Sequence, residues 1–284
     1  MGRRDRPAAE GQRYKRAARS GVEIGPAVWL GAALLVLFLA LPLVALVWRA
    51  ATEASGPASG AGEVLNQALL LSLATSALSL AIILALGTPL AYLLARRRFR
   101  GARLVETLVD LPIVLPPAVA GLALLMAFGR RGLFGRWLDD AGIALVFTTS
   151  AVVLAQLFVA TPFYVRAARG GFARIDSDLE DAAASLGASP FQLFWRVTLP
   201  LARPILGAGA VLAWARALGE FGATILFAGN VPGVTQTMPL AIYGQYNAGD
   251  LRGALLLSLV LLMVALLTLL AVRLLGGRAA DLTA

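Results

Sequence analysis

Long apolar runs separated by short polar stretches make up most of the chain. Six runs are long enough to cross a hydrocarbon core of about 30 Å as helices, because about 20 residues at ~1.5 Å each suffice. The first exceeds the ~7–15 residues of a signal-peptide core, so we expect it to remain in the membrane. The pattern predicts an all-α integral membrane protein with six transmembrane helices, at about 27–48, 65–95, 104–128, 143–165, 203–228 and 253–273.

Two of these runs contain helix-breaking residues at membrane depth. The second would extend about 46 Å as a straight helix, which exceeds the hydrocarbon thickness. It contains Gly87, Thr88 and Pro89, which we expect to bend it, while the third contains Pro112, Pro116 and Pro117. Backbone groups freed at such breaks must be satisfied by neighbouring protein or by a watery cavity. We therefore expect these two spans to face a pathway or a tight bundle.

The composition supports a membrane protein and excludes several kinds of chemistry. Hydrophobic residues form 59% of the 284 residues and charged residues 14%, against about 25% charged in soluble domains. The chain has no Cys and no His, which excludes thiol nucleophiles, the usual zinc ligands and the commonest general base. The only Lys is Lys15, so a phosphate-binding loop ending in Gly-Lys-Ser/Thr is absent. We predict no catalytic residue and no metal site.

Positive charge is distributed unevenly between the two sides of the predicted bundle. Most of the 25 Lys and Arg residues fall in connections that share one side, and this excess marks the cytoplasm. Both termini are therefore expected to be cytoplasmic, with residues 1–26 as a disordered basic tail and 274–284 as the C-terminus. A membrane explains the net charge of +9 better than nucleic acid does.

Two acidic residues open the third predicted span. Glu106 and Asp110 are separated by about one helical turn. We expect them to pair with Arg103 or with Arg residues near the polar segment that follows the fourth span. Neither is assigned to a substrate.

The polar segment between the fourth and fifth spans is typical of two short helices meeting at a corner. Ser177 can cap the first helix, with Glu180 three residues later completing a capping box. Gly187 is the residue type that ends a helix in a left-handed turn. Ser189 can cap the second helix, with Gln192 completing another capping box. Each helix carries an apolar stripe at helical spacing, so each has one face to bury.

Two interpretations of this corner are open. The helices either lie on the lipid surface or fit a socket in another protein. Surface-lying helices usually carry Lys and Arg for anionic headgroups, whereas the first helix here is acidic. Small residues at its end permit close approach of a partner. Both properties favour a protein socket. The acidic residues are Asp176, Asp178, Glu180 and Asp181, and the small residues are Ala182, Ala183 and Gly187.

The same segment resembles a cytoplasmic loop that marks the permease subunits of type I ABC importers. That loop reads Glu-Ala-Ala, three residues, Gly, nine residues, Ile, one residue, Leu-Pro. The match here is Asp181-Ala182-Ala183, Gly187, Val197 and Leu199-Pro200, with Asp in place of Glu and Val in place of Ile. The resemblance covers about 65–273 and implies the type I permease fold, with 170–200 as the loop coupled to an ATPase. The coupling residues it implies are Glu180, Asp181, Ala182, Ala183, Gly187, Leu199 and Pro200.

A second resemblance bears on the substrate. Residues 215–224, Ala-Arg-Ala-Leu-Gly-Glu-Phe-Gly-Ala-Thr, and 235–243, Thr-Gln-Thr-Met-Pro-Leu-Ala-Ile-Tyr, are similar to molybdate permeases. Sulfate permeases share the Arg-Ala-Leu-Gly-Glu-Phe-Gly core but carry a Glu-Ile-Ala-Pro-like run downstream. The contrast favours molybdate, with sulfate or thiosulfate and tungstate as alternatives.

The fifth span carries two ionisable residues, Arg216 and Glu220, four positions apart. Each costs roughly 2.5–3.5 kcal/mol at membrane depth, so both should face the bundle interior. One interpretation is an ion pair that holds helices in register. In the other, Arg216 attracts an oxyanion and Glu220 keeps it from binding too tightly. Gly219 and Gly222 permit close helix approach or a bend, and Thr224 offers a neutral donor, which completes the candidate translocation pathway.

The resemblance implies an assembly and a location. It implies a second copy of the chain, nucleotide-binding subunits that bind ATP and Mg, and an extracytoplasmic substrate-binding protein. The expected location is multi-pass in the cytoplasmic membrane of a bacterium or archaeon, with lipid around it. Two rivals are a secondary transporter, which predicts inverted repeats or charges in several spans, and an intramembrane enzyme, which needs a catalytic set that the chain lacks.

Overall fold

The computed structural model describes residues 25–53, 61–97 and 99–281, and all regular structure in these ranges is helical. The chain divides into two compact units, Met1–Thr52 and Glu53–Ala284. The predicted basic tail falls almost wholly outside the described residues. In the first unit, α2 (Pro26–Thr52) contains the predicted span 27–48. It is long and apolar enough to cross a membrane, with a mean hydropathy of 2.8.

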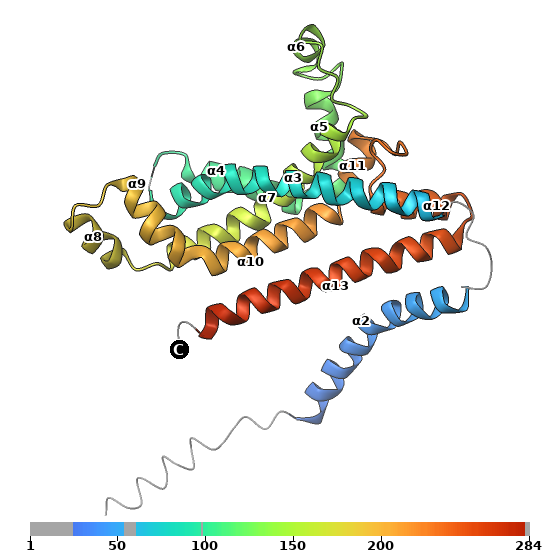
Figure 1. Ribbon diagram of the computed structural model, residues 1–284, viewed down its shortest axis with the longest axis horizontal. Coiled ribbons are helices and arrows are strands. Elements are labelled where there is room, and N and C mark those ends of the chain that lie inside the picture. Colours follow the sequence, from blue (N-terminus) through green and yellow to red (C-terminus); the bar gives the residue numbers. More distant parts are fainter. Residues whose placement is uncertain (1–24, 54–60, 98, 282–284) are drawn as a thin grey trace, which may run out of the picture. The chain divides into compact units, whose positions relative to one another are not determined.

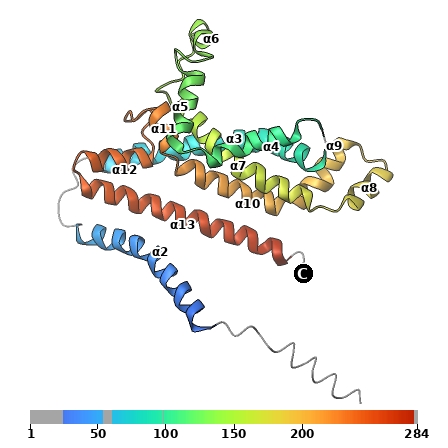
Figure 2. The same ribbon diagram turned by 180° about the vertical axis from the view of Figure 1, so that it is seen from behind.

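Three long helices form the centre of the second unit. They are α3 (Ala61–Arg96), α7 (Thr149–Ala173) and α10 (Leu199–Leu218), and each packs against the other two (Figures 1 and 2). Small residues at the contacts let the helices approach closely. A Cβ atom built on Gly209 of α10 would lie 2.8 Å from the Cβ of Ala167 in α7. α13 (Leu251–Asp281) packs against α10 and α12 (Met238–Asn247).

Buried hydroxyl groups run along one side of α3. We call Ser72, Thr75, Ser76 and Ser79 the hydroxyl seam, and all four are almost inaccessible to solvent. Ser79 donates to the carbonyl oxygen of Val153 in α7 at 3.1 Å. Ser76 accepts from the indole N–H of Trp214 in α10 at 2.9 Å. The seam therefore joins the three central helices by hydrogen bonds that lipid cannot replace.

The third predicted span is two helices instead of one. α4 (Ala102–Val114) and α5 (Pro117–Phe128) are separated at Leu115 and Pro116, whose backbones are extended. A residue before proline is disfavoured in helical geometry, and both positions precede a proline. The break at the Pro116–Pro117 pair is therefore confirmed, whereas Pro112 remains inside α4. In Figure 1, α5 leads away from α4 toward α6 (Gly135–Asp140).

The predicted boundaries of the fourth and fifth spans also need correction. α7 begins at Thr149 instead of 143, because the Thr148 side chain caps it by accepting from the N–H of Ala151. The fifth span begins earlier than 203. Its helical path starts with α9 (Pro190–Leu193) and passes through a five-residue π-helix, η1 (Phe194–Thr198), into α10. It ends at Leu218, and α11 (Gly222–Phe227) follows a short break.

Five helices among the described residues are long and apolar enough to cross a membrane, judged by length and composition. The shorter apolar helix α5 covers the second half of the third predicted span. A crossing made of α4 and α5 together stays a prediction. The spanning segments are Pro26–Thr52, Gly62–Arg96, Thr149–Ala173, Pro190–Leu218 and Leu251–Leu270.

Candidate functional site

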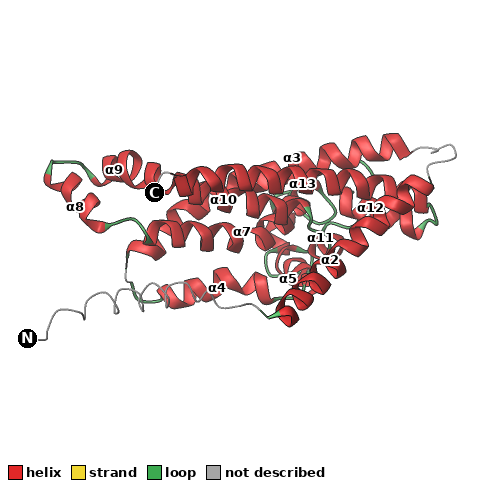
Figure 3. Cartoon of the chain, turned by 90° about the horizontal axis from the view of Figure 1, so that it is seen from below, coloured by secondary structure: helices red, strands yellow, loops and turns green. Residues whose placement is uncertain are grey.

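The predicted corner lies beyond the ends of α7 and α10 (Figure 3). It is formed by α8 (Ser177–Ser185) and α9. Gly187 has φ +87°, the left-handed geometry expected where α8 ends. The second capping box is confirmed, because Ser189 accepts from the N–H of Gln192 at 3.3 Å and its own N–H donates to the Gln192 side chain at 3.0 Å. The corner is therefore built by local interactions that the sequence encodes.

The first capping box was predicted wrongly. Asp176, not Ser177, caps α8, and its carboxylate accepts from the N–H of Asp178 at 3.0 Å. Asp176 has an extended backbone, which places its carboxylate over the first turn, while Ser177 is already helical. Glu180 does not fold back to the start of the helix. Its side chain points inward to other elements.

The outer surface of the corner is acidic and apolar. Asp181, Ala182 and Gly187 are exposed, and Leu186 is 90% exposed. Phe191 on α9 is also exposed. The described part of this chain covers the predicted apolar stripes only in part, because Phe194 packs against Tyr92 and Phe172 whereas Leu186 and Phe191 stay exposed. Large apolar side chains exposed together mark a surface for a partner.

The remaining coupling residues lie deeper. Leu199 and Pro200 are half-buried in the first turn of α10. Glu180 has only 14% of its side chain exposed, and its carboxylate lies 3.2 Å from the guanidinium of Arg96 in α3. The hydroxyl of Thr198 donates to the same carboxylate oxygen at 2.7 Å. The structure therefore separates an outer set at the tip of the corner from an inner set at its base.

The acidic residues that open α4 pair with α7. Arg169 lies 3.1 Å from Glu106, and Arg166 lies 3.5 Å from Asp110. The prediction that these carboxylates pair with Arg residues near the corner is confirmed. The two ion pairs help to hold α4 against the same end of α7 that leads into the corner.

Arg216 and Glu220 form an ion pair, which is the first of the two interpretations of these residues. A guanidinium nitrogen of Arg216 lies 2.6 Å from one carboxylate oxygen of Glu220. The other oxygen accepts from the N–H of Ala223 at 2.7 Å, so Glu220 also holds the start of α11. Its side chain is 1% exposed, whereas that of Arg216 is 27% exposed. The pair thus has an enclosed anionic end and a cationic end that remains partly accessible.

The neighbouring candidate residues are placed differently from one another. Gly219 ends α10 and has room around it, since a Cβ there would meet only the Ala215 oxygen at 3.5 Å. Gly222 permits a close approach, because its Cβ would lie 2.5 Å from the Cβ of Pro117 in α5. Thr224 is fully buried, and its hydroxyl has no hydrogen-bond partner among the described residues. Gly222 and Thr224 therefore belong to the packing of α11, not to an exposed mouth.

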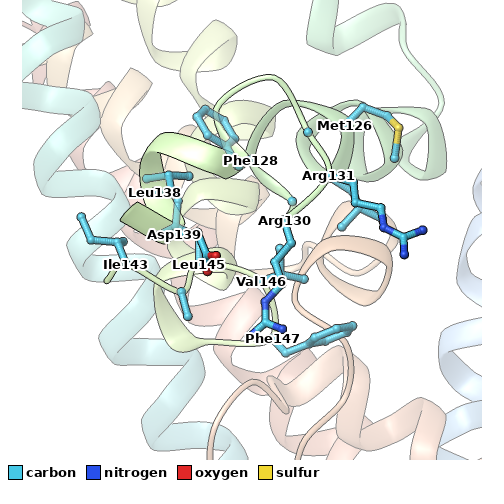
Figure 4. A pocket seen from close by; sticks show the side chains of 15 residues that line it. Met126, Phe128, Arg130, Arg131, Leu138, Asp139, Ile143, Leu145, Val146 and Phe147 are labelled. Atoms are coloured by element: carbon cyan, nitrogen blue, oxygen red, sulfur yellow. The ribbon is translucent and has the colours of Figure 1, made fainter. Parts of the chain in front are cut away.

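A cavity of about 580 Å³ lies between the end of α5, α6 and the loop before α7 (Figure 4). Most of its lining is apolar, including Phe128, Leu138 and Val146, with Arg130, Arg131 and Asp139 among the charged residues. A doubly charged oxyanion needs several polar partners. We do not assign this cavity to the substrate.

Sequence comparisons connect these features to known transport proteins. Residues 87–280 match the family described as binding-protein-dependent transport system inner membrane component. The chain is 47% identical over 253 residues to the molybdenum transport system permease protein ModB of Mycobacterium tuberculosis, covering 86% of this chain and 92% of that protein. ModB of Escherichia coli K12 is 43% identical over 206 residues, 72% of this chain and 90% of that one. A probable sulfate transport system permease of Nephroselmis olivacea is 36% identical over 243 residues, 84% of each chain.

Solved structures show the same fold at low sequence identity. A bacterial ABC transporter involved in alginate import has a chain that matches with a TM-score of 0.70 at 19% identity, covering 91% of this chain and 95% of that one. The MetNI methionine ABC transporter has one that matches with a TM-score of 0.60 at 18% identity, covering 78% and 99%. The chain therefore belongs to the family of binding-protein-dependent transport system inner membrane components and has the fold of type I ABC importer permeases.

Proposed function

We propose that the chain is the permease subunit of an ATP-driven importer of molybdate. The observation that carries the proposal is the 47% identity to a molybdenum permease over 92% of that protein. The sulfate relative is less similar, at 36%. The segment 235–243, which differs from the Glu-Ile-Ala-Pro-like run of sulfate permeases, supports the same choice. Tungstate and sulfate or thiosulfate are the alternative substrates.

The corner is the proposed contact with the ATPase. Asp181, Ala182 and Gly187 are exposed at its tip beside the apolar side chain of Leu186. A partner socket would bury this apolar surface and pair with the acidic charge. In this assembly the partner binds ATP and Mg and hydrolyses the nucleotide, while this chain makes and breaks no covalent bond.

The transport cycle follows from that contact. We propose that two copies of the chain form the pathway and that ATP draws two ATPase subunits together. The sockets then move the corners, and the central helices follow, which exposes the pathway alternately to either side. A substrate-binding protein on the other face delivers the oxyanion. The membrane is the cytoplasmic membrane of a bacterium or archaeon, with both termini and the 170–200 loop in the cytoplasm.

Arg216 is the proposed anion-attracting residue of the pathway. Its guanidinium is partly exposed, while its partner Glu220 is buried and held by the N–H of Ala223. The anion therefore meets a positive group whose charge is partly compensated, so binding is weak enough for release. Gly219, beside the pair, leaves space at the end of α10. Gly222 and Thr224 contribute by positioning α11 against α5.

The test is uptake by the reconstituted transporter. The chain, its ATPase and its binding protein are placed in proteoliposomes, and labelled molybdate and sulfate are supplied with and without ATP inside. We expect ATP-dependent uptake of molybdate in preference to sulfate. Preferential uptake of sulfate would refute molybdate as the substrate and identify the chain as a sulfate permease. Uptake at full rate by the purified chain alone, without ATP, would refute the importer and favour a secondary transporter.

A further inference from the structure

Glu180 connects the corner to two other elements. Its carboxylate lies on α8, yet it binds Arg96 at the end of α3 at 3.2 Å and Thr198 at the end of η1 at 2.7 Å. Arg96 is 84 positions away in the chain and Thr198 is 18. One side chain thus ties the corner to both helices that continue into the membrane.

The surroundings hold this contact in place. Arg96 is 17% exposed, and it also donates to the carbonyl oxygen of Ile175, just before α8, at 3.0 Å. Arg96 therefore contacts both the segment just before α8 and the first turn of α8. Nearby, Tyr92 of α3 makes edge-on ring contacts with Phe172 of α7 and Phe194 of η1, at centroid distances of 5.5 and 5.0 Å. The end of α3 and the base of the corner are packed as one piece.

The π-helix gives the contact with Thr198 a specific consequence. A π turn has one more residue per hydrogen-bonded ring than an α turn, and such turns are frequent at functional sites. Thr198 is fully buried and ends the π turn. Its hydroxyl is 3.5 Å from its own backbone acceptor, Leu193, but 2.7 Å from Glu180. A change from π to α geometry would rotate the hydroxyl away from the carboxylate.

We propose that Glu180 is a positioning residue that transmits movement of the corner to α3 and, through the π turn, to α10. The inference rests on the proposed function of the corner as an ATPase contact. It assigns different roles to two adjacent acids. Asp181 is exposed and faces the partner, whereas Glu180 faces the chain's own helices. Loss of Glu180 should therefore leave the ATPase bound but disconnect it from the transport helices.

The experiment measures molybdate transported per ATP hydrolysed by the complete transporter in proteoliposomes. For Glu180→Ala we expect a stoichiometric ATPase and about a tenfold lower ratio, because two hydrogen bonds to a charged group are lost. For Thr198→Val, which removes one of them, we expect a fall of about fivefold. Asp140→Ala is the control, since it removes an exposed acid at the end of α6, outside the corner, and its ratio should stay at the wild-type value.

A double-variant cycle separates transmission from general damage. Adding Thr198→Val to Glu180→Ala should lower the ratio no further, because both changes remove the same hydrogen bond. A wild-type ratio in Glu180→Ala, or a loss explained entirely by dissociation of the ATPase, would overturn the inference. If Glu180→Ala fails to fold, a wild-type ratio in Thr198→Val overturns it equally. A wild-type complex that takes up no molybdate with ATP would instead refute the proposed function on which the inference rests.

Discussion

Removing either member of the Arg216–Glu220 pair should destabilise the protein by unequal amounts. Arg216→Ala leaves the Glu220 carboxylate 1% exposed, with a hydrogen bond from the N–H of Ala223. Breaking a buried pair in this way costs about 3–5 kcal/mol, because the remaining charge is neither solvated nor paired. Glu220→Ala leaves a guanidinium that is 27% exposed and more accessible to water. Its main cost is the lost hydrogen bond from the N–H of Ala223, about 1 kcal/mol.

The free energy of unfolding should therefore fall in the order wild type, Glu220→Ala, Arg216→Ala, with the two variants separated by about 2 kcal/mol. The assay is thermal unfolding of the detergent-solubilised protein, where this difference corresponds to about 4–8 °C in Tm. The double variant should be more stable than Arg216→Ala, since it removes the stranded carboxylate. Equal losses in the two single variants, or a double variant whose loss is their sum, would refute the reasoning.

Three further predictions concern the corner and the central helices. Gly187→Trp should abolish uptake while the chain still inserts into the membrane, whereas Gly187→Asn should retain most uptake. Trp at φ +87° strains the backbone and places bulk where the described chain leaves open space for a partner, whereas Asn tolerates this φ and adds little bulk. Normal uptake in the Trp variant would contradict the coupling role of Gly187. Gly209→Leu should lower the free energy of unfolding by about 1–3 kcal/mol, because the added side chain pushes α10 away from Ala167. Gly207→Leu is the control, because Gly207 has open space around it; an equal loss in both variants would contradict the prediction. Leu186→Glu should leave Tm unchanged but reduce co-purification of the ATPase, and undiminished co-purification would argue against a contact at this 90% exposed side chain.

Features set by neighbouring residues were predictable from the sequence. The capping box at Ser189 and Gln192, the left-handed Gly187 and the pairing of Arg216 with Glu220 all involve partners within four positions. The choice of Ser177 as a cap was wrong, although it too is local. Asp176 and Ser177 are both good capping residues, and only the backbone geometry decides between them.

Features set by distant residues were not predictable in the same way. The orientation of Glu180 depends on Arg96, far away in the chain, and the sequence carries no signal for that pairing. The break at Pro116 was predicted because proline acts on its own backbone, whereas α4, which packs against α7, continues through Pro112. The π-helix η1 was missed because nothing in its composition distinguishes it from an α turn.

The hydroxyl seam limits how the central helices can move. Sliding α3 past α7 by a single residue would break the bond from Ser79 to Val153, and sliding it past α10 would break that from Trp214 to Ser76. Each stranded buried group would cost about 1–3 kcal/mol. The three helices should therefore tilt together as one lever, so that a small displacement at the corner becomes a larger one at the opposite end of the membrane.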